Sequence, residues 1–265
     1  MKCTHGSKAI LMRAFLLTCW VLLRSVAFGQ TGEHLPGMGP RAIDNDKLQQ
    51  GLARLKDGTF YLVDIDRIAE AHVVQAIPGL KKQFGQTQDE RSKSKIAAAL
   101  VQLREKDNTY WQYLVTEAMP ALESDAPNQT AFDSKGRGIP VLSAEFVAWA
   151  KAHNLSTDAA LALAFQFTQN VLFLAETRDQ RAIPLLRRAL SSKIFMVQAL
   201  AAGGLAKIPD KASIPLIIAA CQKAPADVAF AISRASLVDF NDPEAQKAAK
   251  IFADALPPRE KSPQP

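Results

Sequence analysis

The sequence is poor in the residues that disulfides, metal sites and most catalytic centres require. Among 265 residues it has 3 cysteines and 4 histidines. Cys3 and Cys19 fall in an N-terminal segment that we expect to be removed, which leaves Cys221 alone. A single cysteine excludes an intrachain disulfide, so we expect apolar packing to stabilise the fold and Cys221 to be a small buried member of the core.

Motifs for catalysis are also missing. The sequence has no glycine-rich phosphate loop, no nucleophile elbow and no His-Glu-x-x-His motif. The nearest approach to a polar cluster is Asp64, Asp66, Glu70 and His72. On one helix the last three do not share a face, so we interpret the group as the solvated start of a helix. We predict no catalytic residue, no metal site and no cofactor.

Residues 1–29 have the pattern of a secretory signal peptide. Basic residues precede an apolar run over 14–23, and small residues, Ala27 and Gly29, occupy the two positions that a signal peptidase reads. The run is too short to cross a hydrocarbon core, which needs about 20 residues. We expect cleavage before Gln30 and export to the periplasm or the extracellular space, with Met12 as an alternative start of translation.

Long apolar runs and an excess of one charge are absent from the rest of the chain. After residue 29, no stretch reads as long enough to span a bilayer. Residues 1–29 hold four bases and no acids, so removing them leaves 28 of the 32 bases against 26 acids, a net charge of +2. Because a protein that follows a nucleic-acid backbone needs a concentrated basic face, we predict no nucleic-acid partner.

A repeat organises the C-terminal half. Asp179-Gln-Arg-Ala-Ile-Pro184-Leu-Leu returns as Asp210-Lys-Ala-Ser-Ile-Pro215-Leu-Ile, and 210 minus 179 gives a period of 31 residues. A fixed period in this range indicates stacked supersecondary units. We expect each aspartate to cap the first helix of a pair and each proline to bend that helix.

Each copy of the repeat predicts two helices with one apolar face each. The residues expected to point inward are Ile183, Leu186, Leu190, Ile214, Ile217 and Cys221 in the first helices, and Ile194, Val197, Ala201, Leu205, Ile208, Val228, Ala231, Ile232 and Ala235 in the second. Small residues over 201–204 should let neighbouring helices approach closely. A last helix over 243–256 should shield the end of the row, and the proline-rich tail 257–265 is expected to be disordered.

The N-terminal half reads as an earlier, more divergent copy. After a flexible linker over 30–43, we expect helices over 44–57, 68–84 and 89–106, and a short helix from Asp107 with Trp111 inward. Prolines and glycines over 120–142 predict an irregular insertion without regular structure, either a surface segment with a function or a hinge. Helices should follow over 143–153 and from Thr157 to just before Asp179.

Over residues 179–186 and the partner helix 198–208, the chain resembles HEAT repeats, particularly the short bacterial type also found in phycobilisome lyases. The resemblance is specific over 179–240 and extends less clearly to 66–106 and 241–256. It implies an all-α fold, an α-α superhelix of about four to five helix pairs over 44–256, with a concave surface that binds proteins. It supplies no catalytic residue to transfer.

Four residues are candidates for an interaction surface. Tyr110 and Tyr113 should point away from Trp111 and either pack under the 120–142 insertion or face a partner. Arg187 and Arg188 should lie on the outward side of a first helix, so that alanine at Arg187 costs little stability.

These observations favour an exported, non-enzymatic scaffold that binds an unidentified protein. Two alternatives stay open. One is a lyase-like or protein-modifying accessory enzyme of the phycobilin-lyase type, which would need polar groups that converge in a groove. The other is a subunit of an envelope assembly.

Overall fold

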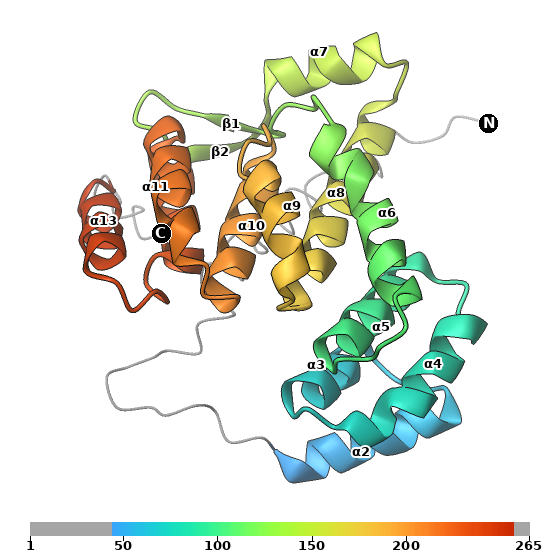
Figure 1. The fold of residues 1–265 in the computed structure, drawn as a ribbon. Helices are drawn as coiled ribbons and strands as arrows, with labels where there is room; N and C mark the ends of the chain where they lie inside the picture. The colour runs from blue at the N-terminus through green and yellow to red at the C-terminus, as the bar shows by residue number, and fades with distance from the viewer. Residues whose placement is uncertain (1–43, 257–265) are drawn as a thin grey trace, which may run out of the picture.

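The computed structural model describes residues 44–256, so the predicted signal peptide, linker and tail lie outside the described part. Figure 1 shows a bent row of helices with one small hairpin at its edge. The elements are α2 (Asn45–Asp57), α3 (Leu62–Glu70), η1 (Val74–Ala76), α4 (Ile77–Gln86), α5 (Glu90–Gln102), α6 (Thr109–Glu123), β1 (Thr130–Phe132), β2 (Gly138–Leu142), α7 (Ala144–Ala152), α8 (Thr157–Glu176), η2 (Gln180–Ala182), α9 (Ile183–Ala189), α10 (Phe195–Lys207), η3 (Lys211–Ser213), α11 (Ile214–Lys223), α12 (Ala226–Ser236) and α13 (Pro243–Asp254).

The helices pack in pairs, which confirms the expected α-α superhelix. The pairs are α2 with α3, α4 with α5, α6 with α8, α9 with α10 and α11 with α12, while α13 covers the last pair. The second members α3, α5, α8, α10 and α12, which we call the inner row, also stack on one another in this order. They contact each other more extensively than the first members do, so the inner row is the more tightly packed side of the superhelix.

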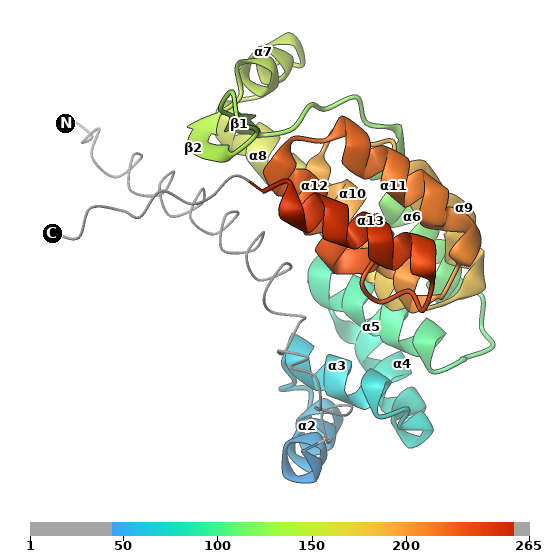
Figure 2. The same cartoon turned by 90° about the vertical axis from the view of Figure 1, so that its left-hand side faces the viewer.

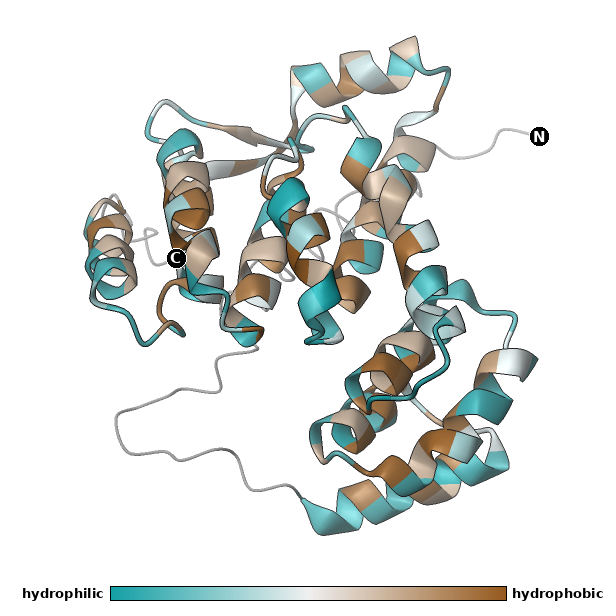
Figure 3. Cartoon of the chain, in the orientation of Figure 1, coloured by the Kyte–Doolittle hydropathy of each residue, from teal (hydrophilic) through white to brown (hydrophobic). Residues whose placement is uncertain are grey.

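Two apolar cores divide the row into two arms, visible at the lower right and upper left of Figure 1. The N-terminal arm comprises α2–α5 and the start of α6, and the C-terminal arm comprises the later elements. Figure 3 shows the apolar colouring concentrated where helices of each arm face one another. Phe173 of α8 packs into the N-terminal core, and Trp111 contacts both cores, so α6 and α8 join the arms.

Three first helices begin in the same way. A single 3₁₀ turn leads directly into α4, α9 and α11, and a proline occupies the first turn of each, namely Pro78, Pro184 and Pro215. Amides in the first turn have no helical acceptor, so a residue without an amide proton is tolerated there. The prediction that these prolines bend their helices is therefore wrong, because they lie where the helices start.

The two repeated aspartates have different roles. Asp179 caps as predicted, because its carboxylate accepts the amide of Arg181 at 2.9 Å. Asp210 does not cap a helix. Its carboxylate instead accepts hydrogen bonds from the guanidinium of Arg187, with Nη2 at 2.8 Å and Nε at 3.0 Å. It also accepts one from the hydroxyl of Ser213. Arg187 thereby ties α9 to the start of the next pair.

Glycines in α10 allow the close packing that the sequence predicted. A Cβ on Gly204 would lie 2.6 Å from the Cβ of Ala175 in α8. A Cβ on Gly203 would lie 3.0 Å from the carbonyl oxygen of Ala235 near the end of α12. Separations under 3 Å are hard clashes, so the α8–α10 contact needs glycine at position 204.

Most of the predicted inward faces are buried. Leu186, Ile217, Val197 and Leu205 have no exposed surface. Ile183 and Ala235 are only half-buried. Cys221 is buried as expected, and burial raises the pKa of its thiol to about 12, so it remains protonated at neutral pH.

The predicted continuous helix over 68–84 is wrong. The chain leaves the helical conformation at His72, whose φ is 51°, and re-enters it through η1. The amides of His72 and Val73 bond back to the carbonyls of Ala69 and Ile68, which closes the end of α3. Helix α3 begins at Leu62, six residues before the predicted start at 68.

The 120–142 segment is not structureless, which corrects the prediction. Helix α6 continues to Glu123 with Pro120 inside it, and the amide of Asn170 in α8 donates to the carbonyl of Glu117 at 2.7 Å. A hairpin of β1 and β2 follows, paired antiparallel with an irregularity next to Thr130. The side chain of Asn170 thus ties α8 to the turn of α6 that precedes Pro120.

The hairpin segment contacts the starts of two inner helices, α10 and α12, at one edge of the row. The amide of Phe195 at the start of α10 donates to Asn128 at 3.3 Å, and Phe132 packs edge-on against the Phe195 ring. At the start of α12, the amide of Asp227 donates to the Gly136 carbonyl at 3.2 Å. Figure 2 shows the hairpin and α7 together at this edge. The segment therefore connects the N-terminal ends of α10 and α12.

Helix α8 corrects the expectation that no later stretch could span a bilayer. Within the described residues it alone has the length and apolar composition for a span. Half of its apolar window is buried inside the fold, where it packs on α6 and α10. We interpret α8 as the central core helix of the row.

Candidate functional site

A polar hollow lies at the inside of the bend, where the C-terminal ends of inner helices meet. The first part of the hollow, of about 170 Å³, is lined by Asp66 and Glu70 of α3, Lys95 and Gln102 of α5, Glu176 of α8 and Lys207 of α10, among others. A second part of about 300 Å³ shares Gln102, Arg178 and Lys207 with it. We call these the inner hollow and the outer hollow.

Lys95 is the centre of the inner hollow. Its side chain is only 7% exposed, and its ammonium contacts Asp66 and lies 2.7 Å from Glu176 Oε2. Burial lowers the pKa of Lys95, but the two carboxylates raise it by more than burial lowers it, so the net shift is upward. The ammonium therefore stays charged and links α3, α5 and α8.

The surroundings of Glu176 disfavour its charged form. Burial raises the pKa of Glu176, Lys95 lowers it, and Asp66 raises it again because two carboxylates share one ammonium. The net shift is upward. The cluster thus joins the arms by an ion triad whose charges are partly desolvated, an arrangement found both at structural junctions and at binding sites.

Lys207 stands at the mouth between the two hollows. Its side chain is exposed, but protein atoms crowd around it in the hollow and displace part of its hydration shell. This partial desolvation lowers the pKa of its ammonium. Glu176 opposes the shift by raising that pKa. Arg178 lies beside it, with Nη2 3.9 Å from Glu70 Oε1, a long contact on the surface.

Gln102 is buried at the boundary of the two hollows with its amide nitrogen unsatisfied. The residue is 8% exposed, and Nε2 has no hydrogen-bond partner among the described residues. Leaving a buried donor unpaired costs about 1–3 kcal/mol. An acceptor oxygen placed in the hollow would remove that cost.

Basic residues occupy the positions after three inner helices where the backbone conformation usually selects glycine. His72 after α3, Arg104 after α5 and Arg178 after α8 have φ values of 51°, 64° and 51°, in the left-handed region that usually selects glycine. All three line the outer hollow. The charged side chains of Arg104 and Arg178 also complement the partial negative charge of helix C-termini.

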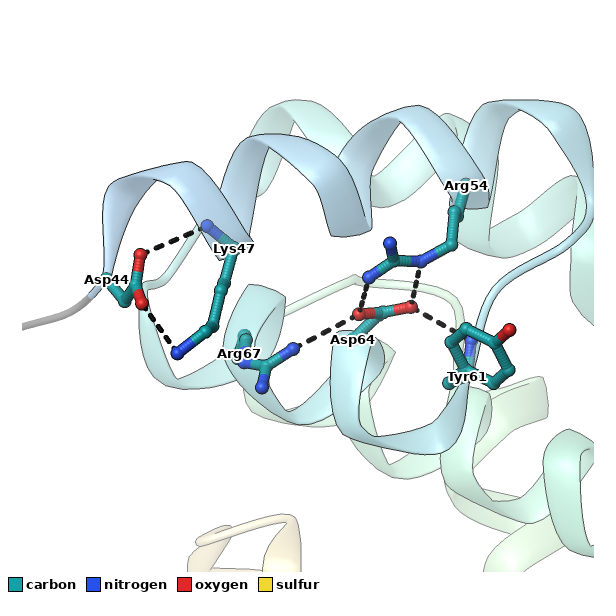
Figure 4. A network of polar contacts seen from close by, with 6 residues as sticks. All are labelled: Asp44, Lys47, Arg54, Tyr61, Asp64 and Arg67. Atoms are coloured by element: carbon teal, nitrogen blue, oxygen red, sulfur yellow. Dashed lines mark hydrogen bonds and ion pairs between the residues drawn. The ribbon is translucent and has the colours of Figure 1, made fainter.

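The predicted solvated cluster at the start of α3 is wrong for Asp64, which is fully buried, whereas Glu70 and His72 are exposed as expected. Figure 4 shows Asp64 held by Arg54 of α2, with Nη2 at 2.6 Å and Nε at 2.8 Å, and by Arg67 at 3.3 Å. The amide of Tyr61 also donates to it at 2.9 Å. The hydrogen bonds from Arg54 lower the pKa of Asp64 despite its burial. Asp66 and Glu70, by contrast, face the inner hollow.

The two candidate tyrosines pack on Phe84 and not under the hairpin segment. Tyr110 is 6% exposed and meets the Phe84 ring edge-on at 5.0 Å, so it is a core residue. Tyr113 is half-buried and donates from its hydroxyl to Glu90 at 2.9 Å. Burial raises the pKa of Tyr113 well above its usual value.

The two candidate arginines lie on α9, outside the hollow. Arg187 is occupied by Asp210 and Ser213, which corrects the expectation that it is a dispensable surface residue. Arg188 is exposed, with Nη2 3.7 Å from Glu123 Oε1. None of the four candidates lines the inner or outer hollow.

Sequence reasoning missed the hollow because its residues come from four helix ends that are distant in the chain. The one available signal was that the short turns after 70, 102 and 176 contain His or Arg where glycine is usual. Across residues 44–256, no group of three or more His, Cys, Asp or Glu side chains could hold a metal ion.

Comparison with known families identifies the repeat. The family described as the PBS lyase HEAT-like repeat matches residues 197–223, from α10 through α11. The chain contains a HEAT-like repeat. No curated protein matches it. The matched stretch joins the second helix of one HEAT-like pair to the first helix of the next, the junction that Arg187 and Asp210 fasten.

Proposed function

We propose that this HEAT-like protein is an exported scaffold that binds a protein partner at the inside of the bend and has no catalytic role of its own. The observation that carries the proposal is the hollow at the C-terminal ends of α3, α5, α8 and α10, with its unsatisfied Gln102 amide. Concave surfaces of helical solenoids are extended binding surfaces, because each repeat contributes a few side chains to one continuous face.

The rest of the surface supports the same assignment. The hairpin fastens the opposite ends of α10 and α12, so the helix ends at the hollow are left without such a cover. Apolar side chains exposed on the outer faces, such as Leu216 and Val74, are scattered on different helices. Single exposed apolar residues are normal and do not mark an interface.

Affinity capture tests the proposed binding. A tagged chain, expressed in its own host, should retain a specific protein, and Lys207→Glu at the mouth of the hollow should abolish that retention. Arg188→Glu on α9 is the matched control and should retain it. Recovery of the same proteins by all three chains would contradict the proposal. A chromophore bound in place of a protein would favour the lyase-like alternative.

Export is tested separately. N-terminal sequencing of the protein recovered from its host should begin at Gln30. A chain that still carries residues 14–23 would overturn the proposed export and leave the binding proposal untouched.

A further inference from the structure

We propose that the outer hollow binds the carboxylate of a glutamate or aspartate side chain in an extended acidic segment of the partner. This inference rests on the proposed function and specifies its chemistry. It is carried by the unpartnered amide of Gln102 together with the charge of the residues around it.

The Gln102 amide points to an acceptor. Its residue is 8% exposed, it lines both hollows, and its Nε2 lacks a partner within the described chain. An amide nitrogen can only donate, so the group that satisfies it must carry a lone pair. Carboxylate oxygens are the strongest common acceptors of protein side chains.

The lining of the outer hollow favours an anion. Its basic members are His72, Arg104, Arg178 and Lys207, and its other members are neutral, including Thr177, Gln180 and Ile208. No Asp or Glu belongs to this lining. The C-terminal helix ends carry partial negative charge, and the basic residues located there offset it. An incoming carboxylate therefore meets donors and cations.

The neighbouring inner hollow limits the charge of the ligand. Glu70 and Glu176 line it, and Glu70 already lies 3.9 Å from Arg178. These carboxylates repel a dianion more strongly than a monoanion. Ile208 and Pro209 in the outer hollow offer apolar contact to the methylene groups of a glutamate side chain. A carboxylate side chain thus fits better than a phosphate group.

Nuclear magnetic resonance on the isotope-labelled protein tests the proposal with defined probes. The probes are acetyl-Gly-Glu-Gly-amide, acetyl-Gly-Gln-Gly-amide and inorganic phosphate. The Glu peptide should shift the side-chain amide signal of Gln102 and bind about tenfold more tightly than the Gln peptide, the ratio expected for one charge-assisted contact.

Variants locate the site. Gln102→Met keeps the length of the side chain and removes the unsatisfied donor, so it should fold at least as stably and bind the Glu peptide at least about fivefold more weakly, read from the backbone amide of Arg104. Arg178→Gln should weaken binding to a similar extent. Arg188→Gln is the control and should bind as the unaltered chain does.

Three results would overturn the inference: equal shifts from the Glu and Gln peptides, unchanged binding by Gln102→Met, or tighter binding of phosphate than of the Glu peptide. Failure of the proposed function has a different signature. In that case the Glu peptide would bind, yet the tagged chain would retain no protein from its host.

Discussion

The two arms of the molecule reach similar helix-pair geometry by different means. In the C-terminal arm, apolar residues and glycines bring helices together, as at Gly204 against Ala175 and Leu186. In the N-terminal arm, an ion pair between Arg54 of α2 and the fully buried Asp64 of α3 joins the two helices in addition to their apolar contacts. The first arrangement repeats in the sequence and the second does not. One solenoid can therefore combine a regular arm with a divergent arm that adds a buried ion pair to its apolar core, and the polar hollow lies where they meet.

The largest loss of stability is expected from the apolar arm. Leu186→Ala removes a side chain with no exposed surface and should lower the free energy of unfolding by about 4 kcal/mol, as large-to-small core changes do. Urea denaturation followed by circular dichroism measures it. Leu216→Ala on the exposed side of α11 is the control and should cost less than about 1 kcal/mol. Equal losses would show that the assigned inward face is wrong.

The charged arm should respond to Asp64→Asn, with a loss of about 3 kcal/mol, because a buried ion pair is broken while both arginines remain. Asp44→Asn at the exposed cap of α2 is the matched control, expected to change stability by less than about 1 kcal/mol. An unaltered unfolding midpoint in Asp64→Asn would remove the distinction between the arms.

The same pair predicts a pH dependence. The pKa of Asp64 is lowered in the folded protein, so its contribution to stability is present above the unfolded carboxyl pKa of about 3.9 and is lost as the pH falls through the folded value. The stability difference between the unaltered chain and Asp64→Asn should be full at pH 7 and shrink below about pH 4. A difference that is constant down to pH 2 would contradict this.

Gly204→Ala tests close packing in the apolar arm. The added Cβ would lie 2.6 Å from Ala175 Cβ, so the helices must separate, at a cost of about 2 kcal/mol. Gly85→Ala in α4 is the matched control, because its Cβ would meet nothing within 4 Å. That change should stabilise the protein by up to about 1 kcal/mol through helix propensity. Stabilisation by both changes would mean that α8 and α10 do not depend on the glycine.

Arg187→Ala should have the smallest of these effects, about 1.5 kcal/mol, because it removes charged hydrogen bonds to Asp210 and Ser213 at the junction of two pairs. Arg188→Ala, one residue away and exposed, should change stability by less than about 0.5 kcal/mol. Thermal unfolding of the two variants side by side decides whether the junction contributes.

The sequence predicted the apolar arm well, because a period of 31 residues places Leu186 and Ile217 at equivalent inward positions and both are fully buried. It predicted less of the charged arm, since nothing near Asp64 in the sequence indicates that Arg54 reaches it from the preceding helix. The hairpin was missed because its strands are short and depend on contacts with Phe195 and Asp227, far along the chain. The hollow was missed for the same reason, as Lys95 and Glu176 are 81 residues apart.

Photo-crosslinking in the host tests the central claim most directly. A photoreactive amino acid is placed at position 180, where Gln180 lines the outer hollow and is exposed, or at position 216, which is exposed on the outer face of α11. The proposed function predicts a strong crosslink to one protein from position 180 and little or none from position 216. Crosslinking from position 216 alone, or equally from both positions, would contradict the assignment of the inside of the bend as the binding surface.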